Sequence, residues 1–188
     1  MMRSFELPRH RRANVWLDEA LPADFTATSL VKRVVQPRVV VAAARCIAGV
    51  ELNIAHGPRS SYGLLGAELV DANVDGLEVV VSVNTVGFPF QHSLALQPEE
   101  VKVGLLDEYA DAVIAGVAKV AESVGAPSKA SLRFRWAAHG LVGSSSSVFE
   151  KVSGIVVQLL TLPRDASTEE IQRCLCRVPF RPFCVTVL

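Results

Sequence analysis

The chain has 188 residues with 19 basic and 19 acidic side chains, so its formal net charge is zero. A zero net charge excludes a global field that attracts nucleic acid, and any RNA binding must therefore use local patches. Half of the residues are hydrophobic and only 20% are charged, which favours a buried interface between copies of the chain or a covered sheet face. The length is sufficient for a substantial core in a single domain.

Hydropathy and cysteine content bear on the compartment. No apolar stretch reaches the roughly 20 residues that a membrane-spanning helix needs, and residues 1–16 are basic but lack the apolar segment of a signal peptide. We therefore expect a cytoplasmic protein without a membrane partner. The cysteines are Cys46, Cys174, Cys176 and Cys184. Their single C-x-C pair has no second pair and no nearby histidine, so we expect reduced structural thiols and no cofactor, with a metal site as the alternative.

Residues 1–28 contain two prolines, Pro8 and Pro22, and a basic run from Arg9 to Arg12. This composition predicts a flexible or loosely docked lead that precedes a single α+β domain over residues 29–188. A run of charged side chains is usually solvated, although such a run can also form an arm that grips phosphates. We interpret the run as a solvated surface and keep the phosphate-binding arm as the alternative.

Strand and helix patterns alternate along the rest of the chain. The density of β-branched residues over 29–54 predicts two or three strands, which would extend the sheet at its N-terminal side. The Asp75-Gly76 turn signal precedes a further strand over Leu77–Val83. The segment 103–125 has helical periodicity and predicts a surface helix that lies on a sheet. Its apolar stripe consists of Tyr109, Val113, Gly116, Val117, Val120 and Val124, and its charged residues are Asp107, Glu108, Asp111, Lys119 and Glu122.

A strand is expected over residues 130–136. There Leu132, Phe134 and Trp136 alternate with Arg133 and Arg135, which places both arginines on one face and the apolar residues on the other. The order of strands, helix, strand and helix indicates an α+β sandwich in which a sheet carries helices on one face.

The C-terminal third contains signals for two more helices and a strand. The hydroxyls of Ser144–Ser147 are suited to cap a helix that begins near Val148. Ser167 and Glu170 have the spacing of a capping box at the start of a third, short helix. After Pro179 and Pro182, we expect an apolar strand over residues 183–188.

Three groups of residues resemble motifs of domain IV of the elongation factor G family. They are Gly104, Glu108, Tyr109, Ala112, Val113, Gly116 and Gly125 for its helix; His139, Val142, Ser144, Ser145, Phe149 and Lys151 for its tip loop; and Gly57, Arg59, Tyr62 and Gly63 for its second glycine-rich loop. The resemblance covers residues 55–162 and implies a fold like that of ribosomal protein S5 domain 2. It also implies that the two glycine-rich turns lie side by side at the tip, with residues 59–62 next to residues 139–141.

No sequence feature demands catalysis. The chain lacks the G-x-x-x-x-G-K-[ST] phosphate loop, so we expect neither GTP binding nor GTP hydrolysis. The serine run could be combined with His92 or His139, but there is no G-x-S-x-G elbow and no obvious acidic partner. Asp107, Glu108 and Asp111 are explained by the favourable interaction of negative charge with a helix N-terminus. We therefore expect a protein that is not an enzyme.

Recognition is the better-supported chemistry. The candidate RNA-binding residues are Arg133 and Arg135 on the predicted strand face and Arg59, Tyr62 and His139 at the predicted tip. Arginine bridges phosphates, while tyrosine or histidine stacks on an unpaired base. The opposing interpretation is that the strand arginines pair with acidic neighbours and that the tip loops only turn the chain. Two hypotheses follow: a stand-alone domain IV-like protein that binds RNA or the ribosome, and a protein-interaction or self-associating module without a nucleic-acid role.

Overall fold

The computed structural model describes residues 2–56, 59–84, 87–96 and 98–177, and it has a mixed α+β fold. Its eight strands form one sheet in the order β1-β2-β4-β5-β8-β6-β3, with β7 also paired to β8. The strands are β1 (Arg3–Leu7), β2 (Arg11–Leu17), β3 (Ser29–Val35), β4 (Ile47–His56), β5 (Arg59–Asp71), β6 (Leu77–Val83), β7 (Val101–Val103) and β8 (Ala130–Gly140). β6 and β8 are parallel, because the chain crosses over between them through a helix.

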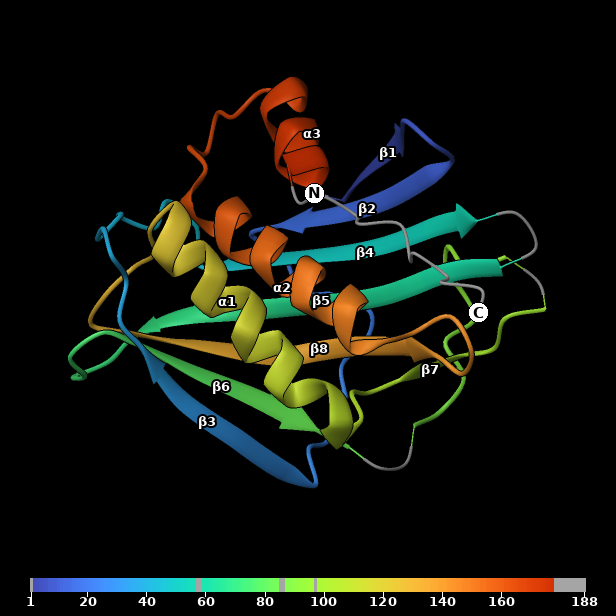
Figure 1. Ribbon diagram of the computed structural model, residues 1–188, viewed down its shortest axis with the longest axis horizontal. Coiled ribbons are helices and arrows are strands. Elements are labelled where there is room, and N and C mark those ends of the chain that lie inside the picture. The colour runs from blue at the N-terminus through green and yellow to red at the C-terminus, as the bar shows by residue number, and fades with distance from the viewer. Residues whose placement is uncertain (1, 57–58, 85–86, 97, 178–188) are drawn as a thin grey trace, which may run out of the picture.

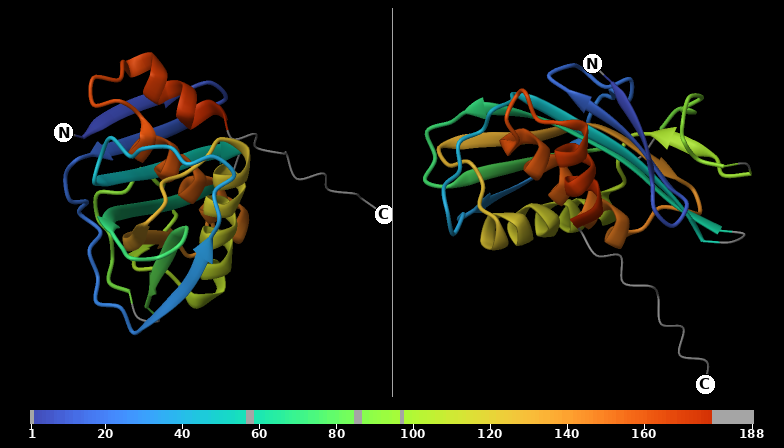
Figure 2. Two further views of the ribbon diagram at one scale, coloured as in Figure 1. Left: turned by 90° about the vertical axis from the view of Figure 1, so that its left-hand side faces the viewer. Right: turned by 90° about the horizontal axis from the view of Figure 1, so that it is seen from above.

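Helices cover one face of this sheet (Figure 1). They are α1 (Ala110–Ser123), which follows a 3₁₀ turn at Asp107–Tyr109, α2 (Ser146–Thr161) and α3 (Thr168–Arg177). α1 and α2 lie side by side across the strands, whereas α3 contacts α2 and the edge strand β1. The two further views in Figure 2 place α1 and α2 on the same side of the sheet. The predicted α+β class, with helices on one face, is confirmed.

The periodicity of the first helix correctly identified its buried side. Within α1, Val113, Gly116, Val117 and Val120 are buried, and the charged residues of the predicted polar side are exposed. Val124 lies just beyond the last turn and is 48% exposed. Of the residues predicted for the apolar stripe, Val120 is therefore the last that is buried, because Val124 follows the end of the helix.

A second apolar cluster lies on the sheet face away from the helices. Trp16, Tyr62 and Trp136 pack there with Leu21 from the segment after β2. The approach is close, since a Cβ atom on Gly66 would lie 2.7 Å from a methyl group of Leu21. This cluster explains part of the high apolar content, because the second face is partly covered by the chain itself.

A β-bulge in β8 changes which face the predicted apolar residues occupy. The register with β5 shifts at Gly66/Ala67, where Gly66 faces Trp136 and Ala67 faces Phe134. Arg135 is therefore the extra residue, and side chains after it switch faces. Phe134 packs in the core beneath the helices, whereas Trp136 packs in the second cluster. The prediction that Leu132, Phe134 and Trp136 share one face of the sheet is therefore wrong for Trp136, although all three residues are buried.

The prediction of a flexible N-terminal lead is also wrong. β1 and β2 form a hairpin in which Leu7 faces Arg11, and β2 pairs with β4 along its length. Ala13 and Val15 are buried in the main core. The sequence pattern did not indicate these two strands because their pairing depends on distant β4, whereas the prolines and the basic run dominate the local composition.

Only one of the two predicted serine caps forms as expected. At α3 the Glu170 backbone N–H donates to Ser167 Oγ at 3.2 Å, and the Ser167 N–H donates to Glu170 Oε2 at 2.7 Å, which is a complete capping box. At α2 the N-cap residue is Ser145, but no side-chain cap hydrogen bond is present. The helix begins at Ser146, two residues before the predicted start.

Several other expectations concern the thiols, the membrane and the end of the chain. Within the described residues, Cys46, Cys174 and Cys176 form no disulfide, as expected of reduced thiols. No described helix has the length and apolar character to span a bilayer. Cys184 and the strand expected at 183–188 lie outside the described residues.

Candidate functional site

The start of β5 and the glycine- and serine-rich turn after β8 lie side by side at one end of the sheet, as the resemblance implies for these residues. The Tyr62 backbone N–H donates to the Gly143 carbonyl at 3.0 Å. Ser144 Oγ donates to the Tyr62 carbonyl at 2.7 Å and accepts from the Gly140 N–H at 2.8 Å. These bonds join the start of β5 to the connection between β8 and α2, at the right-hand end of the sheet in Figure 1.

The tip residues expected to stack on bases are not available for stacking. Tyr62 is fully buried, and its hydroxyl donates to Glu51 Oε1 at 2.9 Å. His139 is 4% exposed, with Nδ1 2.9 Å from the Gly104 carbonyl oxygen. Both residues lie within strands whose side chains point into packed layers, so this part of the prediction does not fit. Arg59 is the first residue of β5, and its side chain lies outside the described part of the chain.

The tip turn between β8 and α2 is already held by an acidic side chain. The backbone N–H groups of Val142 and Gly143 both donate to Glu99 Oε1, at 2.9 and 3.0 Å. Adjacent N–H groups of this kind can bind an anion, and here the anion is a carboxylate from the same chain. The outermost side chains of this turn are apolar, since Leu141 is 51% and Val142 is 83% exposed.

Arg133 and Arg135 share an exposed sheet face, as predicted, but acidic residues balance them. Arg135 lies 3.4 Å from Glu68 and 4.0 Å from Asp24, and its guanidinium lies 5.1 Å from the centroid of the Trp136 ring. Arg133 faces Glu68 directly across the β5–β8 pair. The surface is therefore of mixed charge. The interpretation that strand arginines pair with acidic neighbours holds for Arg135.

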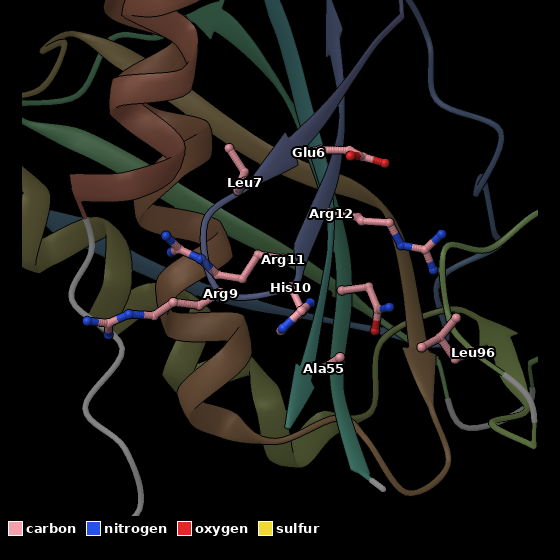
Figure 3. A pocket seen from close by; sticks show the side chains of 9 residues that line it. Glu6, Leu7, Arg9, His10, Arg11, Arg12, Ala55 and Leu96 are labelled. Atoms are coloured by element: carbon pink, nitrogen blue, oxygen red, sulfur yellow. The ribbon is translucent and has the colours of Figure 1, made fainter. Parts of the chain in front are cut away.

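A basic turn that was not among the predicted site residues lies at the same end as the glycine-rich turns. It comprises the connection between β1 and β2 at residues 8–10 and the first two residues of β2, and the Ala55 N–H donates to the His10 carbonyl at 3.2 Å. Arg9 and His10 are exposed. Figure 3 shows Arg9 and Arg11 on one side of the hairpin and Arg12 on the other, toward Leu96. We call residues 8–12 the basic turn.

The basic turn borders an open surface depression of about 540 Å³, here called the turn cavity. Its charged lining consists of Arg9, His10, Arg11 and Arg12 against a single acidic residue, Glu6. Asn53 of β4 also lines it and is only 1% exposed. Its Oδ1 atom has no hydrogen-bond partner among the described residues. The lining of the cavity thus carries surplus positive charge, whereas the Asn53 Oδ1 atom itself is buried beneath it.

A buried carboxylate fixes one wall of the turn cavity. Glu51 is fully buried and accepts hydrogen bonds from Asn14 Nδ2 at 2.9 Å, from the Tyr62 hydroxyl and from the Leu94 N–H at 2.6 Å. Arg12 Nη2 donates to the carbonyl of the same Leu94 at 2.9 Å. The loop that carries Leu96 is therefore tied to β2 and β4 at two points.

The environment of Glu51 also shifts its pKa. Burial raises the pKa of this carboxyl above its ordinary value of 4.5, while the hydrogen bonds from Leu94, Tyr62 and Asn14 and the nearby Arg12 charge oppose the rise. Burial and the neighbouring Glu51 raise the pKa of Tyr62 well above its usual range. Glu51 therefore retains its proton to a higher pH in the folded protein than in the unfolded chain.

The raised pKa of Glu51 predicts a pH-dependent difference between the protein and its Glu51→Gln variant. A carboxyl with a raised folded-state pKa stabilises fully below the unfolded value of 4.5, and this contribution is lost as pH rises through the folded-state pKa. We expect the free energy of unfolding of Glu51→Gln, relative to the native protein, to increase as pH rises from about 4.5. Urea titrations across this range provide the measurement. A difference that is flat or falls with pH would contradict the assignment.

Comparison with known proteins identifies no relative: no family model, no curated protein and no solved structure matches the chain. The likeness to domain IV of the elongation factor G family therefore rests on the residues quoted above and on no independent match.

Proposed function

We propose that the protein is a non-catalytic RNA- or ribosome-binding protein of the cytoplasm, with a ribosomal protein S5 domain 2-like core, that contacts RNA through the basic turn. The carrying observation is the charge of the turn cavity. Three arginines and a histidine meet one glutamate there, although the whole chain is neutral. Such a local patch suits the phosphate backbone, which dominates the affinity of proteins for nucleic acids.

Backbone geometry supports a binding role for the basic turn. Arg9 and His10 have φ angles of 63° and 54°, a left-handed conformation that asparagine and glycine adopt more readily. For an arginine this conformation costs on the order of 1 kcal/mol. Residues held in unfavourable conformations cluster at functional sites. The basic side chains thus occupy positions where turn stability alone would favour other residues.

The basic turn lies beside the tip that the resemblance implies. The turn is hydrogen-bonded to the end of β4 through Ala55, and β4 leads to the glycine-rich loop before β5. An RNA that contacts the tip would therefore also contact the basic turn. Tyr62 and His139 then serve as supports inside this end, and the strand pair Arg133/Arg135 lies on a separate, charge-balanced face.

The double substitution Arg9→Asn/His10→Gly tests the proposal without weakening the fold. It removes the exposed basic side chains and installs residues suited to positive φ, so the free energy of unfolding should stay equal or rise by about 1 kcal/mol. We expect the affinity for structured RNA to fall about tenfold at ~0.1 M salt, and the slope of log affinity against log salt to decrease by about 1. Fluorescence anisotropy measures both quantities.

The matched control is Arg133→Ala/Arg135→Ala, which removes two arginines from the charge-balanced face. This control should change RNA affinity by less than about twofold, because surface charges in compensated pairs contribute little. The proposal is wrong if the control abolishes binding and the turn variant binds like the native protein.

A second candidate function is self-association through the edge strand β3. Its outer residues Leu30 and Val34 are 53% and 51% exposed, and β3 is the terminal strand of the sheet order. An edge strand with exposed apolar side chains is a template for pairing with another chain. Sedimentation velocity of the native protein and of Leu30→Lys/Val34→Lys would test this function: a dimer that the substitutions dissociate supports it, and a monomer in both samples excludes it.

A further inference from the structure

The second apolar cluster occupies one part of the sheet face away from the helices, and an open surface depression of about 340 Å³ lies on another part of it. Phe25 contacts the cluster and also lines the depression. We call the part of the sheet that forms this depression the open face. Its lining includes Leu30 and Lys32 of β3, Glu78 and Val80 of β6, Arg133 of β8 and Glu68 of β5.

Strand register arranges the side chains of the open face in rows across four strands, which lie in the order β3, β6, β8 and β5. Val31 and Val35 of β3 pack toward the main core, so Leu30, Lys32 and Val34 point to the open face. In strand order, one row is Lys32, Val80, Arg133 and Glu68, and the next row is Val34, Glu78, Ser131 and Val70. The two rows are about 7 Å apart, which is twice the rise per residue of a strand.

The open face carries two cations and two carboxylates that can take further partners. Among the described residues, no ion pair involves the side chain of Lys32 or Arg133. The carboxylates of Glu78 and Glu68 contact polar groups of the same chain through their Oε2 atoms, at 2.7 and 3.4 Å. Because a carboxylate has about four acceptor sites, each of the two can also accept from a cation of another molecule.

We propose that the open faces of two copies of the chain pack on each other in a symmetric dimer, with the two-fold axis parallel to the strands and between β6 and β8. Rotation about this axis exchanges the positions of β3 and β5 and those of β6 and β8. Lys32 then lies opposite Glu68 of the partner subunit, and Val34 lies opposite Val70 of the partner subunit. Arg133 lies one row away from Glu78 of the partner subunit, a distance that its long side chain spans.

The charge pattern determines the direction of the axis. An axis across the strands would place β3 against β3 of the partner subunit, and β3 has no acidic residue to meet Lys32. An axis along the strands instead brings both free cations to carboxylates. Each contact occurs twice, because a two-fold interface is self-complementary. The pattern of the open face thus fits a second copy of the same chain.

The size of the open face indicates a weak dimer. Four strands about 4.8 Å apart and three rows of side chains cover roughly 400 Å², which is about half of the ~800 Å² per partner in a standard interface. Leu30 and Val34, which are 53% and 51% exposed, would lose contact with water in the dimer. We therefore expect a dissociation constant on the order of 10 μM.

Charge reversal at Lys32 and Glu68 tests the dimer, by sedimentation velocity of the full chain at ~0.05 M salt. Lys32→Glu and Glu68→Lys each place like charges opposite each other twice per dimer, so each variant should dimerise at least about tenfold more weakly than the native protein. An equimolar mixture of the two variants restores both opposite-charge pairs and should form a heterodimer within about threefold of the native affinity. Pairing at the β3 edge would not respond to Glu68→Lys, because β5 is three strands away from that edge.

Arg33→Glu is the matched control, because it makes the same change of charge at the next residue of β3, which is exposed on the other face of the sheet. It should leave dimerisation unchanged. A native protein that is monomeric up to about 300 μM, or a dimer that Lys32→Glu and Arg33→Glu weaken equally, would overturn the inference. This comparison stands even if Glu68→Lys does not fold, and none of these outcomes depends on RNA binding.

Discussion

Gly116→Ala is expected to lower the free energy of unfolding by about 2–3 kcal/mol, although alanine is the better helix former. Gly116 lies where α1 crosses α2, and a Cβ atom there would overlap the Glu150 carbonyl oxygen and Ser153 Oγ. Helix propensity favours alanine by about 1 kcal/mol. Overpacking typically costs about 1–3 kcal/mol and more when a backbone atom must move, and here the obstructing atom is a main-chain oxygen. The helices must separate, so the clash outweighs the gain in propensity.

Gly154→Ala provides a matched control for this prediction. Gly154 lies in α2 at the same helix crossing, but the nearest atoms to a Cβ atom there would be Val120 Cγ2 at 3.1 Å and the Gly116 carbonyl oxygen at 3.4 Å, so the overlap is much smaller. The same gain in helix propensity then offsets a smaller clash, and the change should stay within about 1 kcal/mol. Urea denaturation of both variants measures the two changes in the free energy of unfolding. Equal stability of the two would show that the α1–α2 contact is looser than described.

Glu51→Leu is the second substitution with a large expected effect, a loss of about 3–5 kcal/mol in the free energy of unfolding. Leucine would leave the Tyr62 hydroxyl, Asn14 Nδ2 and the Leu94 N–H without their common acceptor. Each unsatisfied buried donor costs about 1–3 kcal/mol, and the losses partly overlap because the groups are neighbours. Removal of a desolvated carboxylate offsets only part of this cost.

Glu51→Gln separates the hydrogen bonds of Glu51 from its charge. Its amide oxygen still accepts, and Asn14 can turn its own amide because its Oδ1 partner is the hydroxyl of Ser4, 2.8 Å away, which can donate or accept. Glu51→Gln should therefore remain folded where Glu51→Leu is strongly destabilised, as thermal unfolding would show. Similar losses in both variants would mean that the negative charge, rather than the set of acceptors, holds the loop at Leu94.

Features encoded by neighbouring residues were predictable from the sequence. The capping box of Ser167 and Glu170 and the strand Leu77–Val83 formed as expected, because spacing and local composition determine them. The juxtaposition of the start of β5 with the turn after β8 also appeared. It was implied by the resemblance, whereas no local pattern in the sequence indicates it.

Features that depend on partners distant in sequence were not predictable in the same way. The β1–β2 hairpin needs β4 to pair with it, and the bulge at Arg135 exists only in its pairing with β5. Tyr62 looked like a stacking residue, but its ring fills the second apolar cluster. The basic run was visible as composition, yet only the hairpin brings it to the end of β4 and beside Asn53. The proposed function adopts the alternative interpretation of this run, an arm that grips phosphates.

The most direct test of the RNA-binding account is equilibrium binding of the native protein to ribosomes and to a panel of structured and single-stranded RNAs, measured over a salt series by co-sedimentation and filter binding. With about three arginine–phosphate contacts, the account predicts that log affinity falls linearly with log salt, with a slope of about −2 to −3. Absence of binding at low salt, or binding that salt does not weaken, would contradict the account and direct attention to self-association through β3.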